Sequence, residues 1–523
     1  MRTVGERLVE GLAARGVEVV FGIPGVHTVE LYRGLSGSPI RHVTARHEQG
    51  CGFMADGYAR ASGKPGVAFV ITGPGLTNTL TAMGQAREDS VPMLVISGVN
   101  RRASLGRGLG RLHELPDQHA MVATLCPSRQ ILEPSDVAPA LDWAFQRLTA
   151  GRPGPVHIEV PTDVMPLPCP ALPTPGHPVA RPLPPGIEAA LPLLQAARRP
   201  VILTGGGMRG AEAELQALAE MLDAPVVLTA NARGMLHGHE LGVPASPSLE
   251  AVRALIAGSD QVLALGTELG QTDYDMYGRD SFPDLDAMIR VDVCADQLAR
   301  HRAAVALQGD GRAAARWLAD RLRPRSLGGA GRARETRAAA LAELVGLNPR
   351  MPQQLEMVEA IRLALPGSLI VGDSTQPIYA ANLYYDHDLP GGWFNAATGF
   401  GALGFGPGAA VGAAIARPDR KVVCLVGDGG LQFSPGELRT AVDEKADVTF
   451  LVWNNAGFRE IAEAMRDANT EVIGCHPSPL RLEPFAAACD LPFTSIPMEP
   501  EILIWALQQP CVGPRLIEIR VTV

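Results

Sequence analysis

Short apolar runs, each rich in β-branched residues, alternate with longer helix-like stretches along the whole chain. The runs are continuously apolar, which is typical of strands that are covered on both faces in a parallel sheet. The pattern therefore predicts an α/β fold built from doubly wound parallel sheets. The expected strands are 17–22, 67–72, 91–98, 156–160, 201–204, 226–228, 262–265, 288–291, 369–371, 421–426 and 448–453.

Two punctuated segments divide this pattern into three parts. Residues 166–186 hold too many prolines for a helix or a central strand, so we expect a semi-rigid linker there. Residues 323–352 form a weaker boundary, with a short helical run between glycine- and proline-containing ends. The sequence thus predicts three domains, over 1–165, 187–325 and 350–523.

The first and last parts of the chain resemble each other. In the first part a Gly-Pro-Gly turn (73–75) precedes a helix-like stretch and the apolar run 91–98. In the last part a Gly-Asp-Gly turn (427–429) precedes a similar stretch and the run 448–453. We therefore expect the first and third domains to be related, with a different domain between them.

Composition narrows the class of protein. The net charge of −9 argues against nucleic-acid binding. Eight scattered cysteines without a CxxC pair favour reduced thiols, and the charged N-terminus does not resemble a signal peptide. The uncharged stretch 396–416 is rich in glycine, so we expect a loop that enters a buried helix and no membrane span. These features predict a cytoplasmic protein.

A strand–turn–strand motif in the third part carries candidate chemistry. The run 421–426 leads into Gly427, Asp428, Gly429 and Gly430, and the run 448–453 leads into Asn454 and Asn455. Because parallel strands end at the same rim of a sheet, Asp428 and Asn455 are expected to converge there as oxygen ligands for Mg²⁺. The glycines allow backbone N–H groups to approach a phosphate. The alternative is a tight turn without a ligand.

This motif resembles the cofactor signature of thiamine diphosphate enzymes, in particular the acetohydroxyacid synthase-like family, and the resemblance covers nearly the whole chain. It implies that Asp428, Asn455 and the carbonyl of Gly457 hold Mg²⁺. It also implies a thiamine diphosphate site made by residues that follow strand ends: Ser374, Thr375, Gln376, Gly427, Gly429 and Gly430.

A second signature lies in the first part, in the segments 46–50, 55–60 and 72–78. By itself Glu48 is either a carboxylate that shares a proton with a heterocycle or a surface helix cap. The resemblance implies the first role. Glu48 would activate the cofactor, Gly73 and Asn78 would lie beside it, and decarboxylation would proceed through an ylid and an enamine.

The segment 401–406 is the expected orienting device for the cofactor. The resemblance implies that Leu403 wedges between the two cofactor rings and that the Gly401 carbonyl accepts a hydrogen bond; the alternative for Leu403 is core packing. Since Glu48 and Asp428 lie in different domains, the resemblance also implies a site shared by two chains. We expect at least a homodimer, and a homotetramer is common in such families.

Three departures from the synthases bear on the reaction. The central part lacks their Arg/Asp-rich run after residue 266, so we expect no FAD. His113 stands where they have a Phe-Gln pair, and it could protonate the carbon that has lost CO₂. Its alternative is a structural role. Glu114, Asp117 and Glu460 could form an acidic substrate pocket, although Glu460 equally suits a solvated helix start.

The segments 21–32, which includes His27, and 112–118 look most like the 5-guanidino-2-oxopentanoate decarboxylase branch. We expect non-oxidative decarboxylation of a 2-oxo acid, with this compound as a candidate substrate. The alternatives are an acetolactate synthase-type carboligase, a non-catalytic protein of the same fold and a dehydrogenase. No GxGxxG with a suitably spaced acidic residue supports the last.

Overall fold

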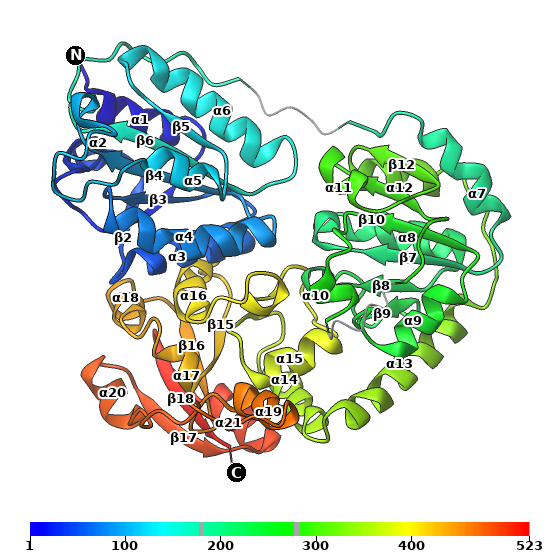
Figure 1. Cartoon of the computed structure of the whole chain (residues 1–523). Coiled ribbons are helices and arrows are strands. Elements are labelled where there is room, and N and C mark those ends of the chain that lie inside the picture. Colours follow the sequence, from blue (N-terminus) through cyan, green and yellow to red (C-terminus); the bar gives the residue numbers. More distant parts are fainter. Residues whose placement is uncertain (177–181, 277–282, 522–523) are drawn as a thin grey trace.

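Each third of the chain folds around its own six-stranded parallel sheet (Figure 1). The computed structural model describes residues 1–176, 182–276 and 283–521. The prediction of an α/β fold with three parallel sheets is confirmed. Every sheet lies inside one of the three predicted domain ranges, and we propose domain limits close to those ranges. The linker predicted at 166–186 lies partly outside the described residues.

The first sheet has the strand order β2-β1-β3-β4-β6-β5. Its strands are β1 (Val19–Gly22), β2 (Arg41–Thr44), β3 (Gly66–Val70), β4 (Met93–Val99), β5 (Ser128–Gln130) and β6 (Pro155–Pro161). Its helices are α1 (Val4–Ala13), α2 (Val29–Leu35), α3 (Glu48–Ser62), α4 (Pro74–Glu88), α5 (Gln118–Ala123) and α6 (Val137–Thr149). Every residue of β3, β4 and β6 is buried, which accounts for their continuous apolar runs.

The central sheet has the order β12-β11-β10-β7-β8-β9. Its strands are β7 (Pro200–Thr204), β8 (Val226–Leu228), β9 (Gly242–Val243), β10 (Gln261–Leu265), β11 (Ile289–Asp292) and β12 (Val305–Gln308). Its helices are α7 (Ala190–Ala196), α8 (Glu212–Leu222), α9 (Glu250–Ala257), α10 (Gln271–Tyr274), α11 (Ala295–Arg300) and α12 (Gly311–Ala319). The following boundary segment differs from expectation, because most of it forms the long helix α13 (Gly329–Leu347).

The third sheet has the order β14-β13-β15-β16-β18-β17, which repeats the connectivity of the first sheet. Its strands are β13 (Leu369–Gly372), β14 (Trp393–Asn395), β15 (Val422–Gly427), β16 (Val448–Asn454), β17 (Phe493–Pro497) and β18 (Arg515–Arg520). Its helices are α14 (Met351–Ala364), α15 (Gln376–Leu383), α16 (Phe405–Ala416), α17 (Asp428–Leu431), α18 (Glu437–Asp443), α19 (Arg459–Asp467), α20 (Leu482–Ala488) and α21 (Pro500–Gln508). The first and third domains, which were predicted to be related, thus share the same strand order.

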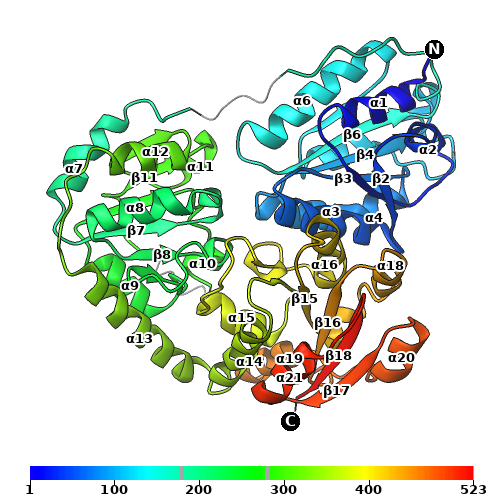
Figure 2. The same ribbon diagram turned by 180° about the vertical axis from the view of Figure 1, so that it is seen from behind.

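Helices α3 and α16 join the first and third domains, and both views of the chain show them against each other (Figures 1 and 2). Their backbones touch at glycines. A methyl group on Gly57 of α3 would overlap the carbonyl oxygen of Ala409, and one on Gly412 of α16 would overlap that of Met54. The uncharged stretch 396–416 is therefore a loop and a buried helix that packs on α3. Among the described residues no helix is long and apolar enough to span a membrane.

A buried polar junction links all three domains beside this helix pair. Arg60 of α3 donates to Asp56 at 2.5 Å and to Asp89 at 2.8 Å. Asp89 also accepts from Asn231 of the central domain at 3.2 Å and from the Thr398 hydroxyl of the third domain at 2.8 Å. Burial raises the pKa of Asp56 to about 6, even though Arg60 opposes this change. The junction pairs charges that would be costly to bury alone, while Oδ2 of Asp56 has no partner among the described residues.

The close approach of α3 and α16 predicts that Gly57→Ala destabilises the protein. The added methyl group meets backbone, which cannot rotate away, so we expect a loss of about 1–3 kcal/mol or more. The midpoint of the first transition in urea measures this. Gly331→Ala is the matched control, because Gly331 lies within α13 with open space around it. Equal urea midpoints for the two variants would contradict the conclusion that the backbones of α3 and α16 touch at Gly57.

Candidate active site

A cavity of about 370 Å³ opens at the carboxyl ends of β13, β15 and β16. The parallel order of these strands brings their following loops to one rim, as expected. All the candidate residues predicted in the third domain line it: Ser374, Thr375, Gln376, Gly401, Leu403, Gly427, Asp428, Gly429, Gly430, Asn455, Gly457 and Glu460. The structure therefore brings one group of sequence-predicted residues together in one hollow.

Three oxygen-bearing groups meet on one wall of this cavity. One end of the Asn455 side-chain amide lies 2.8 Å from the carbonyl oxygen of Gly457 and 3.2 Å from Oδ1 of Asp428. With its nitrogen at this end the amide donates to both oxygens, and with its oxygen there it would join them as a third ligand for a cation. The N–H groups of Asn455 and Gly457 donate to Asp428 at 3.4 and 3.1 Å and fix its carboxylate. One carboxylate, one amide and one carbonyl are a donor set that suits Mg²⁺.

The turn beside the oxygens presents backbone to the cavity. Side chains are excluded at Gly429, where a Cβ would lie 2.6 Å from the ring of Phe458, and at Gly430, where it would lie 2.9 Å from Asp373. Asp373 is fully buried and accepts from the N–H groups of Ser374 and Gly406, both at 2.9 Å. Burial raises its pKa to about 6. Asp373 thus ties the turn after β13 to the start of α16, a role that the sequence reading did not assign.

Leu403 projects from a short loop between Gly401 and Gly404, whose φ angles are +74° and +80°. The side chain of Gln85, from α4, accepts from the N–H of Ala402 at 3.2 Å. The hydroxyl of Ser434 donates to the carbonyl of Gly404 at 2.7 Å. The loop is therefore held from both sides while Leu403 remains in the cavity wall. Neither Gln85 nor Ser434 has a local sequence signal, because each contact is long-range.

Glu48 and Asn78 form a second cluster, in the first domain. Glu48 is the first residue of α3, and Asn78 of α4 donates to its Oε2 at 3.0 Å. The turn before Glu48 is anchored by Glu437 of the third domain, which accepts from the N–H groups of Arg46 and His47 at 3.1–3.3 Å. Glu437 is buried, and burial raises its pKa. It is a positioning residue that sequence reasoning missed.

His27 and His113, also in the first domain, lie against each other with ring centroids 5.3 Å apart. A Cβ on Gly73, whose φ is +62°, would lie 2.6 Å from the carbonyl oxygen of His113, so the turn and the histidine loop touch. Gln118 closes the group, because its side-chain oxygen accepts from the N–H of Gly73 at 3.2 Å. Burial lowers the pKa of His27, and the neighbouring His113 acts in the same direction.

The acidic candidates occupy different settings. Glu114 accepts from the N–H groups of Leu109 and Arg111 at 3.1 and 2.8 Å. Asp117 caps α5 by accepting from the N–H of Ala120 at 2.8 Å. Glu460 lines the cavity instead, and desolvation there raises its pKa. Glu114 and Asp117 thus stabilise the backbone of their own loop, while Glu460 lies in the wall of the cavity.

The two clusters come from different domains and do not share a wall. Every residue that lines the cavity belongs to the third domain, so Glu48, Asn78, His27 and His113 lie outside it within one chain. The chain therefore carries two candidate half-sites: an oxygen- and glycine-lined cavity in the third domain, and the first-domain residues Glu48, Asn78, His27 and His113.

Comparison with known proteins identifies the family. Residues 2–121 match the thiamine pyrophosphate enzyme N-terminal TPP binding domain. Residues 187–318 match the central domain of these enzymes, and residues 373–509 match their C-terminal TPP binding domain. Thiamine pyrophosphate and thiamine diphosphate are the same compound.

Three relatives are similar over most of their length. The "Probable 2-ketoarginine decarboxylase AruI" of Pseudomonas aeruginosa is 42% identical over 487 residues, which is 91% of this chain and 86% of that protein. The "Acetolactate synthase" of Mycobacterium bovis is 32% identical, over 87% of this chain and 76% of that protein. The "Acetolactate synthase isozyme 1 large subunit" of Escherichia coli is 30% identical, over 87% and 82%.

The strand order, the rim cavity and the similarity over most of the chain agree. The chain belongs to the family of thiamine pyrophosphate enzymes.

Proposed function

We propose that this enzyme carries out the non-oxidative decarboxylation of a 2-oxo acid with thiamine diphosphate and Mg²⁺. The cavity in which a carboxylate, a side-chain amide and a backbone carbonyl converge at the rim of the third sheet carries the proposal. The 42% identity to a protein named as a 2-ketoarginine decarboxylase favours that substrate, which is 5-guanidino-2-oxopentanoate.

The third domain would bind the diphosphate and the metal. Asp428, Asn455 and the carbonyl of Gly457 are the proposed Mg²⁺ ligands, and the backbone around Gly429 would bind the diphosphate. The bound cofactor supplies a carbon nucleophile for the 2-oxo carbonyl and an electron sink when CO₂ leaves. Leu403, fixed by its loop, would hold the cofactor in its reactive shape.

Glu48 would hold a proton at the pyrimidine ring of the cofactor, with Asn78 fixing the carboxylate. Because no residue of the first domain lines the cavity, we propose that Glu48 reaches the cavity of a second copy of the chain. Large apolar side chains flank both half-sites and are exposed in one chain, including Val26 at 73% and Ile461 at 53%. Such exposure favours a homodimer, and we propose further pairing to a homotetramer.

His113 would donate the proton that completes an aldehyde product, with His27 beside it. The guanidinium of the substrate would pair with Glu460, which lies in the cavity wall. Glu114 and Asp117 of the second copy would add negative charge beside the guanidinium. Each carboxylate can still accept further hydrogen bonds besides those within its own loop.

Two further expectations stay proposals. We propose that the enzyme works without FAD. In the run that departs from the synthases, Glu268 pairs with Arg152 and accepts from the Ser90 hydroxyl, so it ties the central domain to the first.

We also propose a cytoplasmic location, with which the eight unpaired cysteines agree.

An acetolactate synthase-type carboligase is the second candidate. Relatives that carry that name are 30–32% identical over most of this chain. In that reaction the carbon left after CO₂ loss attacks a second 2-oxo acid, and no proton donor is needed at that step. The facing pair of His27 and His113 favours the decarboxylase instead.

Proton NMR of the protein with thiamine diphosphate and Mg²⁺ distinguishes these reactions. We expect 5-guanidino-2-oxopentanoate to give an aldehyde and pyruvate to remain unchanged. Acetolactate formed from pyruvate would establish the carboligase and contradict the acidic pocket. Omission of Mg²⁺ is the control, and it should abolish product formation.

Glu48→Gln is expected to lower turnover by roughly 10²–10⁴-fold while thiamine diphosphate still binds, since the amide cannot hold the proton. Steady-state rates and calorimetric titration with the cofactor measure the two properties. Glu483→Gln is the control, because Glu483 is exposed in the first turn of α20. Full activity of Glu48→Gln would rule out this mechanism.

His113→Ala is expected to slow aldehyde release roughly 10²-fold more than CO₂ release, because only the later step needs its proton. Single-turnover measurements of both products give the two rates. The same loss in both rates would assign His113 to substrate binding instead.

A further inference from the structure

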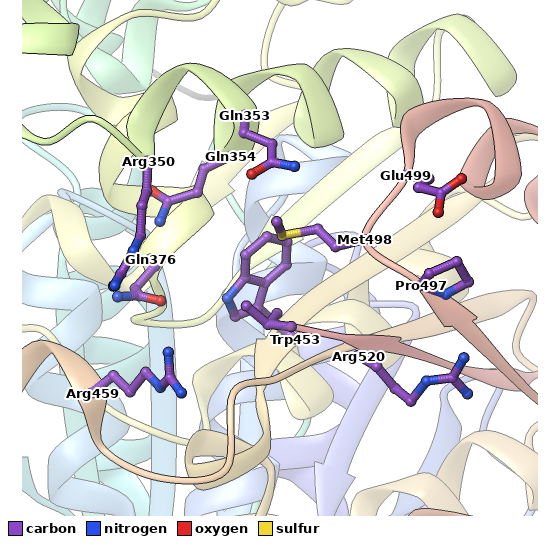
Figure 3. Close-up of a pocket in the computed structure, with 11 residues that line it drawn as sticks. Arg350, Gln353, Gln354, Gln376, Trp453, Arg459, Pro497, Met498, Glu499 and Arg520 are labelled. Atoms are coloured by element: carbon purple, nitrogen blue, oxygen red, sulfur yellow. The ribbon is translucent and has the colours of Figure 1, made fainter. Parts of the chain in front are cut away.

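A second cavity, of about 420 Å³, adjoins the candidate active site on the outer side of the third domain. It lies where α14 begins and where β16, β17 and β18 end, and Figure 3 shows its lining side chains. Gln376 and Arg459 line both cavities, so they form the wall between them. Neither the family resemblance nor the proposed reaction uses this hollow.

The charge of this cavity is positive. Arg350, Arg459 and Arg520 line it, against a single carboxylate, Glu499. Arg350 pairs with Glu463 at 2.7 Å through one nitrogen, and Arg520 donates to the Ser495 hydroxyl at 2.7 Å through one nitrogen. Each guanidinium has five N–H donors, so most of them remain for a ligand.

Arg459 is held with its end groups free. Its Nε donates to the carbonyl oxygen of Asn455 at 2.9 Å, and within the described residues its two terminal nitrogens have no hydrogen-bond partner. Figure 3 shows its guanidinium on the same side of the cavity as Arg350 and Gln376. The two guanidinium groups therefore face a common space.

Trp453 supplies an independent sign of a ligand. Its side chain is only 1% exposed, and its indole Nε1 has no partner among residues 1–176, 182–276 and 283–521. A buried N–H without an acceptor is unfavourable, because it has given up its hydrogen bond to water without a replacement. In Figure 3 this nitrogen points to the space that Arg350, Gln376 and Arg459 border. An indole can only donate, so the missing partner is an acceptor.

We propose that this cavity binds a small organic oxyanion, a carboxylate or a phosphate, through Arg350, Arg459 and the Trp453 indole. The volume exceeds that of a single phosphate group, and Met498 and Pro497 offer apolar contact for a carbon skeleton. Gln354, only 4% exposed, lies in the same wall and adds an amide for a further oxygen.

The bound oxyanion weakens thiamine diphosphate binding in the neighbouring cavity. Arg459 contacts the backbone of Asn455, and the side-chain amides of Asn455 and Gln376 lie 3.1 Å apart. An anion that engages Arg459 lowers the positive potential available to the diphosphate, and the two anions repel each other. Because coupling between two binding sites is reciprocal, bound thiamine diphosphate weakens oxyanion binding by the same factor. This regulatory step, unlike the binding itself, rests on the proposed cofactor site.

Calorimetric titration of the holoenzyme with succinate and, separately, with inorganic phosphate tests the binding. Saturating thiamine diphosphate and Mg²⁺ keep the probes out of the active site. We expect one site per chain for at least one probe. Trp453→Phe and Arg350→Gln should each weaken binding at least tenfold, which equals about 1.4 kcal/mol.

Arg466→Gln is the matched control, because Arg466 is exposed on the same helix as Arg459. Equal binding by all variants, or no saturable binding of either probe, would overturn the site. Binding of phosphate but not succinate would select the phosphorylated class, and the reverse the carboxylate class.

Titration of the apoenzyme with thiamine diphosphate, with and without the bound probe, tests the coupling. We expect the probe to raise the cofactor Kd at least threefold in the wild type and to have no effect in Trp453→Phe. A rise that persists in Trp453→Phe would show simple competition at the diphosphate site. If thiamine diphosphate does not bind at all, the proposed function is wrong. The titration with succinate and phosphate still tests the oxyanion site in that case.

Discussion

The backbone contact between α3 and α16 is the constraint on which both half-sites depend. Helix α3 begins at Glu48, and α16 begins directly after the loop that carries Leu403. The two helices approach so closely because glycines face carbonyl groups at their crossing. Since interiors are packed as densely as organic crystals, a shift at this crossing would move the carboxylate and the leucine loop together. This helix contact therefore couples two positions that would act at two different cavities in the proposed dimer.

Around this helix contact, hydrogen bonds between residues far apart in the sequence hold the candidate functional loops in place. Glu437 of the third domain holds the turn before Glu48, and Gln85 of the first domain holds the loop of Leu403. Asp89 accepts hydrogen bonds from all three domains. The first and third domains thus each support a candidate functional loop of the other. Such support keeps reactive groups in place without help from a ligand.

The sequence predicted the parts of the fold that are apolar on both faces. Interior strands such as β4 and β16 were located within two residues, because burial leaves a continuous apolar run. Edge strands such as β2 and β17 were missed, since they have one neighbour and alternate with exposed residues. Among the interior strands β18 was also missed, because Arg515, Glu518 and Arg520 interrupt its apolar run.

The candidate site shows the same division. Glycine and oxygen-bearing residues that follow strand ends, such as Asp428 and Asn455, could be found because parallel topology sends strand ends to one rim. The anchoring roles of Asp373, Gln85 and Glu437 could not be predicted, since they depend on partners far away in the chain. The helix over Gly329–Leu347 was underestimated, because its flanking glycines and prolines resemble a linker more than helix ends.

The shared strand order of the outer sheets has a consequence for symmetry. Helix α3 precedes β3 in the first sheet, and α16 precedes the equivalent β15 in the third. Their contact is reciprocal: Gly57 of α3 meets Ala409, and Gly412 of α16 meets Met54, with each glycine three residues after the position that receives its counterpart. This is the pattern of an isologous interface, in which one surface binds a copy of itself. A single chain thus contains a pseudo-twofold axis, and its outer domains are arranged as two like subunits would be.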